Sequence, residues 1–135
     1  EIHTLSILGA SEIRLVGPKI FMPDDIDPTK FREFNDMKAG IRDVDVIMML
    51  RIQKERMHQE IIPSEQKYFE SFGLTTDLLQ YAKKNAIVMH PGPINRGVEI
   101  QTEVADSAQS VILAQVTFGI AIRMAVMTML IDKNI

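Results

Sequence analysis

Two short segments hold the residue types that could do chemistry, and the first comprises residues 51–56, with the sequence Arg-Ile-Gln-Lys-Glu-Arg. Arg51 and Gln53 are two positions apart, so their side chains point to one side if the chain leaves the preceding strand still extended. A guanidinium group binds a carboxylate through two parallel hydrogen bonds, and a nearby amide can complete the recognition. The pair therefore suits a small dicarboxylate or an amino acid. The alternative is that the charged residues of this segment form a solvent-exposed, salt-bridged face.

The second segment comprises residues 90–97, with the sequence His-Pro-Gly-Pro-Ile-Asn-Arg-Gly. Two prolines around Gly92 restrict the backbone and limit its rearrangement. Gly92 itself permits a ligand to approach the main chain closely. Such a turn can present fixed carbonyl oxygens to an amine or amide donor. The alternative is a rigid connecting loop without a ligand.

Both segments follow apolar runs that predict buried strands, at residues 44–50 and 86–89. A run that is apolar on both faces is typical of a central strand in a parallel sheet with helices on each side. In such sheets, ligands bind beyond the carboxyl ends of the strands. We therefore expect the two segments to meet at the same edge of the sheet.

The rest of the chain alternates short strands with helices, which predicts an α/β fold with a doubly wound, mainly parallel sheet flanked by helices. Gly9 is expected to end a first helix, and Thr75 to cap a later one. We expect one domain over residues 1–135. The other predicted elements are strands at 13–16 and 31–34, the latter at a sheet edge, and helices at 37–43, 63–72 and 75–84, followed by a long terminal helix.

Composition excludes several classes of function. Hydrophobic residues make up 46% of the chain and charged residues 24%, which is usual for a soluble globular domain. A net charge of −3 argues against a nucleic-acid partner, because phosphate binding needs a concentrated basic face. Without cysteine there is no disulfide, thiolate metal site or thiol nucleophile, which fits the reducing cytoplasm. The chain begins with Glu1 rather than methionine, so we expect position 1 to be a cut within a longer protein.

Residues 111–131 are almost continuously apolar and nearly long enough to cross a bilayer. Gln115 and Arg123 lie within this run, Gly119 interrupts it, and no basic flank sets a topology. An arginine in the middle of a helix is costly in lipid. We therefore expect no membrane contact, and a long helix buried between layers of a soluble domain instead.

Residues 51–56, taken together with residues 90–100, resemble the catalytic chain of bacterial aspartate carbamoyltransferase. The two motifs occur in the order and at about the distance found in that family, and the match continues through 111–115 and 123–125. Ornithine carbamoyltransferase shares the fold, but we expect a cysteine in its corresponding loop, and this chain has none. The resemblance implies the C-terminal, aspartate-binding domain, truncated at its N-terminus, with the carbamoyl-phosphate-binding domain absent.

The resemblance also assigns substrate-binding residues. It implies that Arg51 binds a carboxylate of aspartate and that Gln53 helps to place the substrate amine. His90 opens the second loop, and the backbone of Gly92 and Pro93 would face the carbamoyl group.

Three further residues are expected to support the site without touching substrate. The resemblance implies that Glu55 and Arg56 hold the loop through ion pairs. Arg123, expected to be buried on the last helix, would anchor the site from behind. The resemblance assigns no catalytic residue and no metal ligand within this chain.

The implied reaction transfers a carbamoyl group from carbamoyl phosphate to the amine of L-aspartate, a step of pyrimidine biosynthesis that needs no metal or organic cofactor. The resemblance implies a cytoplasmic homotrimer of the full chain and leaves room for associated regulatory chains. This chain alone is not expected to catalyse the reaction, because the phosphate site belongs to the other domain.

Two alternatives remain open. One is a non-catalytic carbamoyltransferase-like module for binding or assembly, and the other is a carbamoyltransferase for another amino acid, such as ornithine. Phe118 departs from the family pattern, which has a polar residue, usually Asn, at that position. This departure concerns the packing of the last helix more than the substrate.

Overall fold

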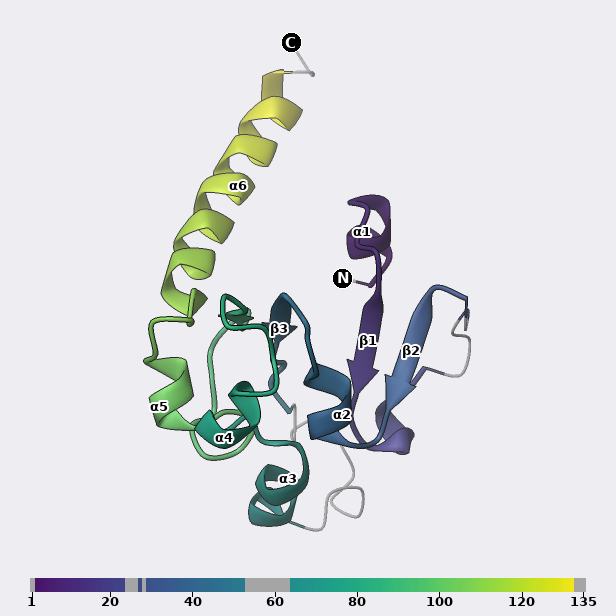
Figure 1. The fold of residues 1–135 in the computed structure, drawn as a ribbon. Coiled ribbons are helices and arrows are strands. Elements are labelled where there is room, and N and C mark those ends of the chain that lie inside the picture. The colour runs from purple at the N-terminus through teal and green to yellow at the C-terminus, as the bar shows by residue number, and fades with distance from the viewer. Residues whose placement is uncertain (1, 24–26, 28, 53–63, 133–135) are drawn as a thin grey trace.

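The structure is a computed structural model that describes residues 2–23, 27, 29–52 and 64–132. Its strands form two parallel pairs (Figure 1). Strand β1 (Ile13–Val16) pairs with β2 (Phe31–Phe34), and β3 (Val46–Met48) pairs with β4 (Ile87–Met89). The predicted parallel α/β architecture with flanking helices is therefore confirmed, as two two-stranded ladders. The bounds predicted for β1 and β2 are those observed.

Short helices connect and flank these strands. The side chains of Asp36, Ser64 and Thr75 cap three of them by accepting a hydrogen bond from a backbone N–H of the first turn. The cap predicted at Thr75 is thus confirmed. The helices are α1 (Ile2–Ile7), the 3-10 helix η1 (Lys19–Phe21), α2 (Met37–Ile41), α3 (Glu65–Phe72), α4 (Thr76–Leu79), α5 (Thr102–Ala105) and α6 (Ile112–Asp132).

Three predicted helices are longer than those observed, and the one expected over residues 37–43 ends at Ile41. The helix expected over residues 75–84 ends at Leu79, because the chain then turns so that Tyr81 and Lys83 form backbone hydrogen bonds with residues 43 and 44. The helix expected from residue 63 begins at Glu65, and Pro63 lies outside the described residues.

The core lies between the β3–β4 ladder and helices α2, α4 and α5. Leu74, Val88, Ile100 and Val104 are fully buried there. Helix α2 lies close to β1, and a side chain at Gly40 would collide with Val16. Burial of the central strands is less complete than predicted, because Val46 of β3 is 47% exposed. One face of this ladder is therefore partly open in this chain.

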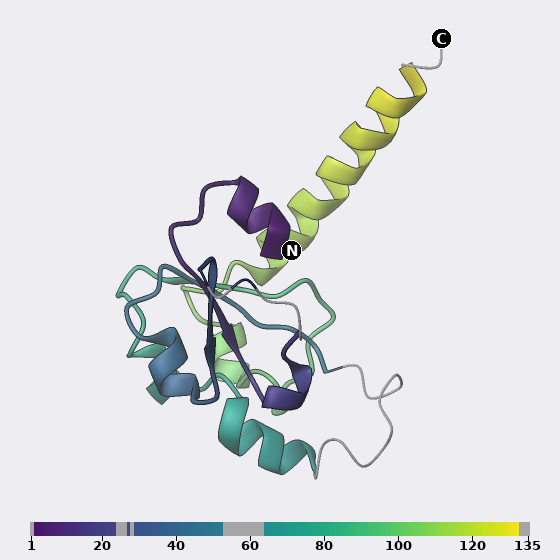
Figure 2. The same cartoon turned by 90° about the vertical axis from the view of Figure 1, so that its right-hand side faces the viewer.

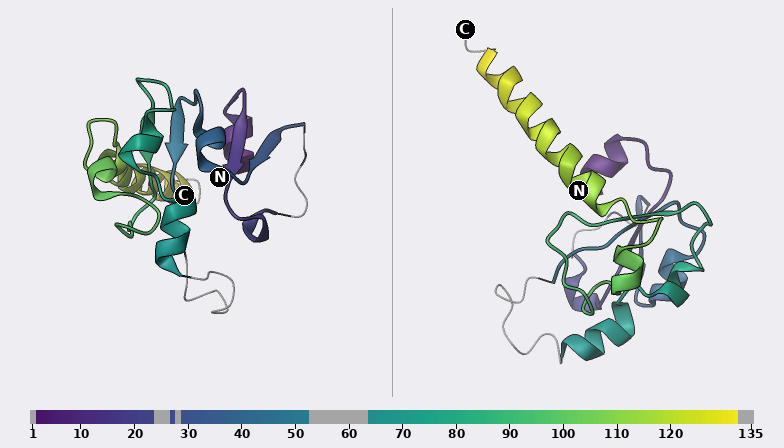
Figure 3. Two further views of the ribbon diagram at one scale, coloured as in Figure 1. Left: turned by 60° about the horizontal axis from the view of Figure 1, so that its bottom comes forward. Right: turned by 90° about the vertical axis from the view of Figure 1, so that its left-hand side faces the viewer.

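Helix α6 departs most from expectation. Figures 1 and 2 show that it projects away from the rest of the domain, and Figure 3 shows the same from two further directions. Its first residue, Ile112, is buried, but only 6% of its apolar stretch is buried within the described residues. The predicted burial between layers is wrong for this chain, because no described element covers α6 beyond its start. By length and composition α6 could cross a membrane, although one such helix is weak evidence for this.

Candidate functional site

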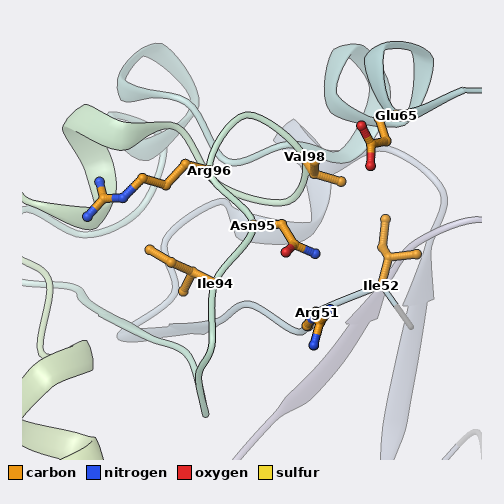
Figure 4. Close-up of a pocket in the computed structure, with 7 residues that line it drawn as sticks. All are labelled: Arg51, Ile52, Glu65, Ile94, Asn95, Arg96 and Val98. Atoms are coloured by element: carbon orange, nitrogen blue, oxygen red, sulfur yellow. The ribbon is translucent and has the colours of Figure 1, made fainter. Parts of the chain in front are cut away.

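A pocket of about 560 Å³ forms where the segments after β3 and β4 meet the start of α3 (Figure 4). The edge predicted from the sequence, beyond the carboxyl ends of two neighbouring parallel strands, thus holds a cavity. Figure 4 shows Arg51 and Asn95 on facing segments of its wall. The residues that line it are Arg51, Ile52, Glu65, Ile94, Asn95, Arg96 and Val98.

The β3–β4 ladder positions Arg51. A backbone hydrogen bond of 2.9 Å from the Met49 N–H to the Met89 carbonyl continues the pairing one residue beyond β3. Ile52 is buried next to Arg51, whereas Arg51 itself is exposed at the pocket wall. Its guanidinium group can bind a carboxylate through two hydrogen bonds. Gln53, Glu55 and Arg56 lie outside the described residues.

His90 lies beneath the second loop, fully buried, and does not line the pocket. The Gly92 N–H donates a 2.9 Å hydrogen bond to its Nδ1, so Nδ1 carries no proton. The proton of the neutral ring is therefore on Nε2, which lies 3.2 Å from Oε1 of Glu99 and donates to it. Burial holds the pKa of His90 below its ordinary value, although the neighbouring Glu99 opposes this shift. His90 is thus a neutral structural link within the loop.

Gly92 and Pro93 form the turn that follows. Gly92 has a φ of +68°, in the left-handed region that favours glycine, which accounts for this residue type at the turn. Pro93 is exposed, and neither residue lines the pocket.

Arg96 also lines the pocket, but its guanidinium group is bound elsewhere. It donates two hydrogen bonds of 2.8 Å to the two carboxylate oxygens of Asp106, just after α5. This pairing raises the pKa of Arg96 and lowers the pKa of Asp106. Figure 4 shows the Arg96 side chain directed away from Arg51. Arg96 therefore ties the pocket rim to α5.

Comparison with known proteins shows the family to which this domain belongs. Residues 2–130 match the family described as aspartate/ornithine carbamoyltransferase, Asp/Orn binding domain. The chain belongs to this family. Its members are transferases, and the domain is the part that binds the amino acid.

Solved carbamoyltransferases share the fold of this domain. The ornithine carbamoyltransferase from Burkholderia thailandensis matches 93% of this chain and 40% of its own, with a TM-score of 0.76 and 20% identity. The aspartate transcarbamoylase from Trypanosoma cruzi, solved with phosphate, matches 86% of this chain and 40% of its own, with a TM-score of 0.70 and 23% identity. These identities show the fold alone.

The ornithine carbamoyltransferase from Pyrococcus furiosus is more similar in sequence. It is 30% identical over 65% of this chain and 28% of its own, with a TM-score of 0.57. The chain therefore spans less than half the length of each of these three relatives. Both acceptor types occur among them.

The position of Arg123 in the structure differs from the one predicted from the sequence. This residue was expected to be buried behind the site, but it is exposed on α6, and its Nε donates to the Gly119 carbonyl of the same helix. The expected burial is wrong because α6 leaves the domain after its first turn.

Sequence reasoning assigned no role to four polar residues of the site, namely Glu65, Asn95, Arg96 and Glu99. Glu65 lies on α3, so only the fold brings it to the pocket. Glu99 had a signal: it is a carboxylate between two apolar residues, Val98 and Ile100, and a buried charge requires partners.

Proposed function

We propose that this chain is the aspartate-binding part of an aspartate carbamoyltransferase. The observation that carries the proposal is Arg51, which lies on the wall of the pocket that follows β3 and β4. Its guanidinium group would receive a carboxylate of L-aspartate. The Asn95 side chain, on the facing segment, offers an amide that can donate to or accept from the same substrate.

The charges of the pocket suit a zwitterionic amino acid. Arg51 offers a cation for a carboxylate, and Glu65 offers an anion for an ammonium group. Arg96 lies at the rim of the same pocket, where it pairs with Asp106. Aspartate has two carboxylates for arginine and amide donors, and the glutamine predicted to help, Gln53, follows Arg51 by two positions.

Ornithine is the second candidate acceptor. The Pyrococcus relative at 30% identity is an ornithine carbamoyltransferase, and Glu65 could bind a side-chain ammonium. We favour aspartate because the loop after β4 contains no cysteine, which we expect in the ornithine enzymes. A pocket wall formed by arginine also suits a second carboxylate better than a second ammonium.

In the proposed reaction, the neutral amine nitrogen of aspartate attacks the carbamoyl carbon of carbamoyl phosphate. A C–N bond forms, the C–O bond to phosphate breaks, and the amine proton leaves with the phosphate or to water. Holding the two anionic substrates in contact is the main contribution, because it converts a bimolecular step into an effectively unimolecular one. The phosphate would be held by the carbamoyl-phosphate-binding domain of the full protein.

The remaining assignments go with this proposal. Gln53 would place the amine, Glu55 and Arg56 would hold the first loop, and the backbone of Gly92 and Pro93 would face the carbamoyl group. The full protein would be a cytoplasmic homotrimer in pyrimidine biosynthesis.

Steady-state carbamoyl transfer by the full-length protein tests the proposal. We expect Arg51→Ala to raise the KM for L-aspartate by about 10- to 100-fold, because a hydrogen bond to a charged group contributes about 1.5–3 kcal/mol. Arg42→Ala is the matched control, since Arg42 is an exposed arginine outside the pocket lining. An unchanged KM for aspartate in Arg51→Ala would contradict the assignment.

A further inference from the structure

Glu99 is a carboxylate with no exposed surface, and it lies beside His90, the other fully buried polar side chain among the described residues. Its neighbours Val98 and Ile100 are buried too, and Ile100 belongs to the main hydrophobic cluster. Burying a carboxylate is unfavourable unless hydrogen bonds compensate it. A hydrophobic residue would fill this position more stably, so the carboxylate requires another explanation.

The hydrogen bonds that Glu99 accepts from described residues come from the loop that forms the pocket wall. Oε1 accepts from the backbone N–H of Asn95, at 2.5 Å, and from Nε2 of His90, at 3.2 Å. One oxygen atom thus joins the beginning and the end of residues 90–95. Oε2 is buried and has no hydrogen-bond partner among the described residues.

The loop depends on side chains for its backbone hydrogen bonds. The N–H of His90 donates to Oε1 of Gln115, at 2.9 Å, and the N–H of Gly92 donates to the His90 ring. Pro91 and Pro93 have no N–H to donate. The side chains of Gln115, His90 and Glu99 therefore accept hydrogen bonds that a neighbouring strand would otherwise accept. Glu99 accepts the one at the end nearest the pocket.

We propose that Glu99 is a positioning residue for the acceptor pocket, acting through the backbone of Asn95 and the neutral ring of His90. Asn95 and Ile94 both line the pocket, on the segment that faces Arg51. Loss of the Glu99 acceptor would release the Asn95 N–H and move this wall relative to Arg51. This inference rests on the proposed use of the pocket for the amino-acid acceptor.

Glu99→Leu and Glu99→Gln in the full-length protein separate positioning from bulk packing. Leucine fills a similar volume without an acceptor, whereas glutamine keeps one oxygen for Asn95 and His90 but buries an amide in place of Oε2. We expect Glu99→Leu to raise the acceptor KM by about 5- to 100-fold, as expected for unsatisfied buried donors, with the KM for carbamoyl phosphate within about twofold. Glu99→Gln should have an acceptor KM close to that of the wild type.

Nuclear magnetic resonance gives a second readout that does not depend on turnover. Histidine-selective 15N labelling reports the Nε2–H of His90, and the signal that disappears in His90→Gln identifies it. We expect this proton to exchange slowly in the wild type and in Glu99→Gln, and rapidly in Glu99→Leu. Glu103→Gln is the control, because Glu103 is an exposed carboxylate on α5.

Each outcome decides the proposal. An acceptor KM that is unchanged in both folded Glu99 variants would overturn it, as would an equal rise in the KM values of both substrates. If Glu99→Leu does not fold, Glu99→Gln decides. A rise in its acceptor KM as large as that of Arg51→Ala would overturn the proposal, because glutamine still offers an oxygen that accepts both hydrogen bonds. If the wild type carbamoylates ornithine and not aspartate, the proposed substrate is wrong, and the Glu99 test is read with ornithine as acceptor.

Discussion

The loop of residues 90–100 and helix α6 show two different ways in which this sequence relates to its structure. The loop has no regular secondary structure over residues 90–95, yet side chains of Gln115, His90 and Glu99 hold its backbone. Helix α6 is the longest regular element among the described residues, yet most of its apolar side chains are exposed, including Ile122 at 65% and Met129 at 63%. Regularity of the backbone and closure of the packing are thus separate properties.

The difference lies in where the stabilising contacts are. The loop makes its contacts within the chain, so its conformation follows from the described residues. Helix α6 is apolar on all sides, and helices of this kind are covered in the protein or lipid that surrounds them. The three solved carbamoyltransferases compared above are each more than twice the length of this chain.

The largest expected effect compares one isoleucine from each region, in residues 1–135. Ile100→Ala should lower the free energy of unfolding by about 2–5 kcal/mol, because Ile100 is fully buried beneath the loop. Ile122→Ala should change it by less than about 0.5 kcal/mol, since Ile122 is exposed on α6. Urea denaturation measures both values. Equal losses in the two variants would show that α6 is covered even in this chain.

A smaller effect concerns the pH dependence of the loop. Burial holds the pKa of His90 below 6.5, so the unfolded state takes up a proton at a higher pH than the folded state. Stability is therefore fully present above about pH 6.5 and falls as the pH drops below it, by at most about 1.4 kcal/mol per pH unit. His90→Gln should reduce this slope, whereas His3→Gln, on the exposed surface, should not. A wild-type slope that persists in His90→Gln would place its origin elsewhere.

The smallest effect concerns the ion pair at the pocket rim. Arg96 and Asp106 form two 2.8 Å hydrogen bonds, but both side chains are largely exposed. Exposed pairs of this kind contribute little to stability and are screened by salt. Asp106→Asn should shift the urea midpoint slightly at low salt and not at high salt. A large shift that is independent of salt would show that the pair is buried in solution.

The sequence predicted the elements whose signals are local. Strands β1 and β2 have the predicted bounds, and Thr75 caps α4, because the residues that favour a strand or cap a helix act over a few positions. Helix α4 ended early because residues 81–83 bind to the segment before β3, which is a tertiary interaction. Apolar composition showed that α6 needs a cover, but it did not show whether this chain supplies that cover.

The outline of the candidate site was also predicted from the sequence. The rule for parallel sheets placed Arg51 and the loop after β4 at one edge, and these segments line one pocket. The direction of each side chain was not predictable from spacing, since His90 turns into the core and Asn95 lines the pocket instead. Glu65 reaches the pocket from α3 only through the fold.

A competition assay tests the proposed acceptor most directly. The full-length protein is given labelled carbamoyl phosphate with equal concentrations of L-aspartate and L-ornithine, and the two carbamoylated products are separated and counted. If Arg51 receives the second carboxylate of aspartate, carbamoyl-aspartate should dominate, and Arg51→Ala should lose most of that product while Arg42→Ala keeps it. Carbamoyl-ornithine as the main product of the wild-type protein would contradict the account.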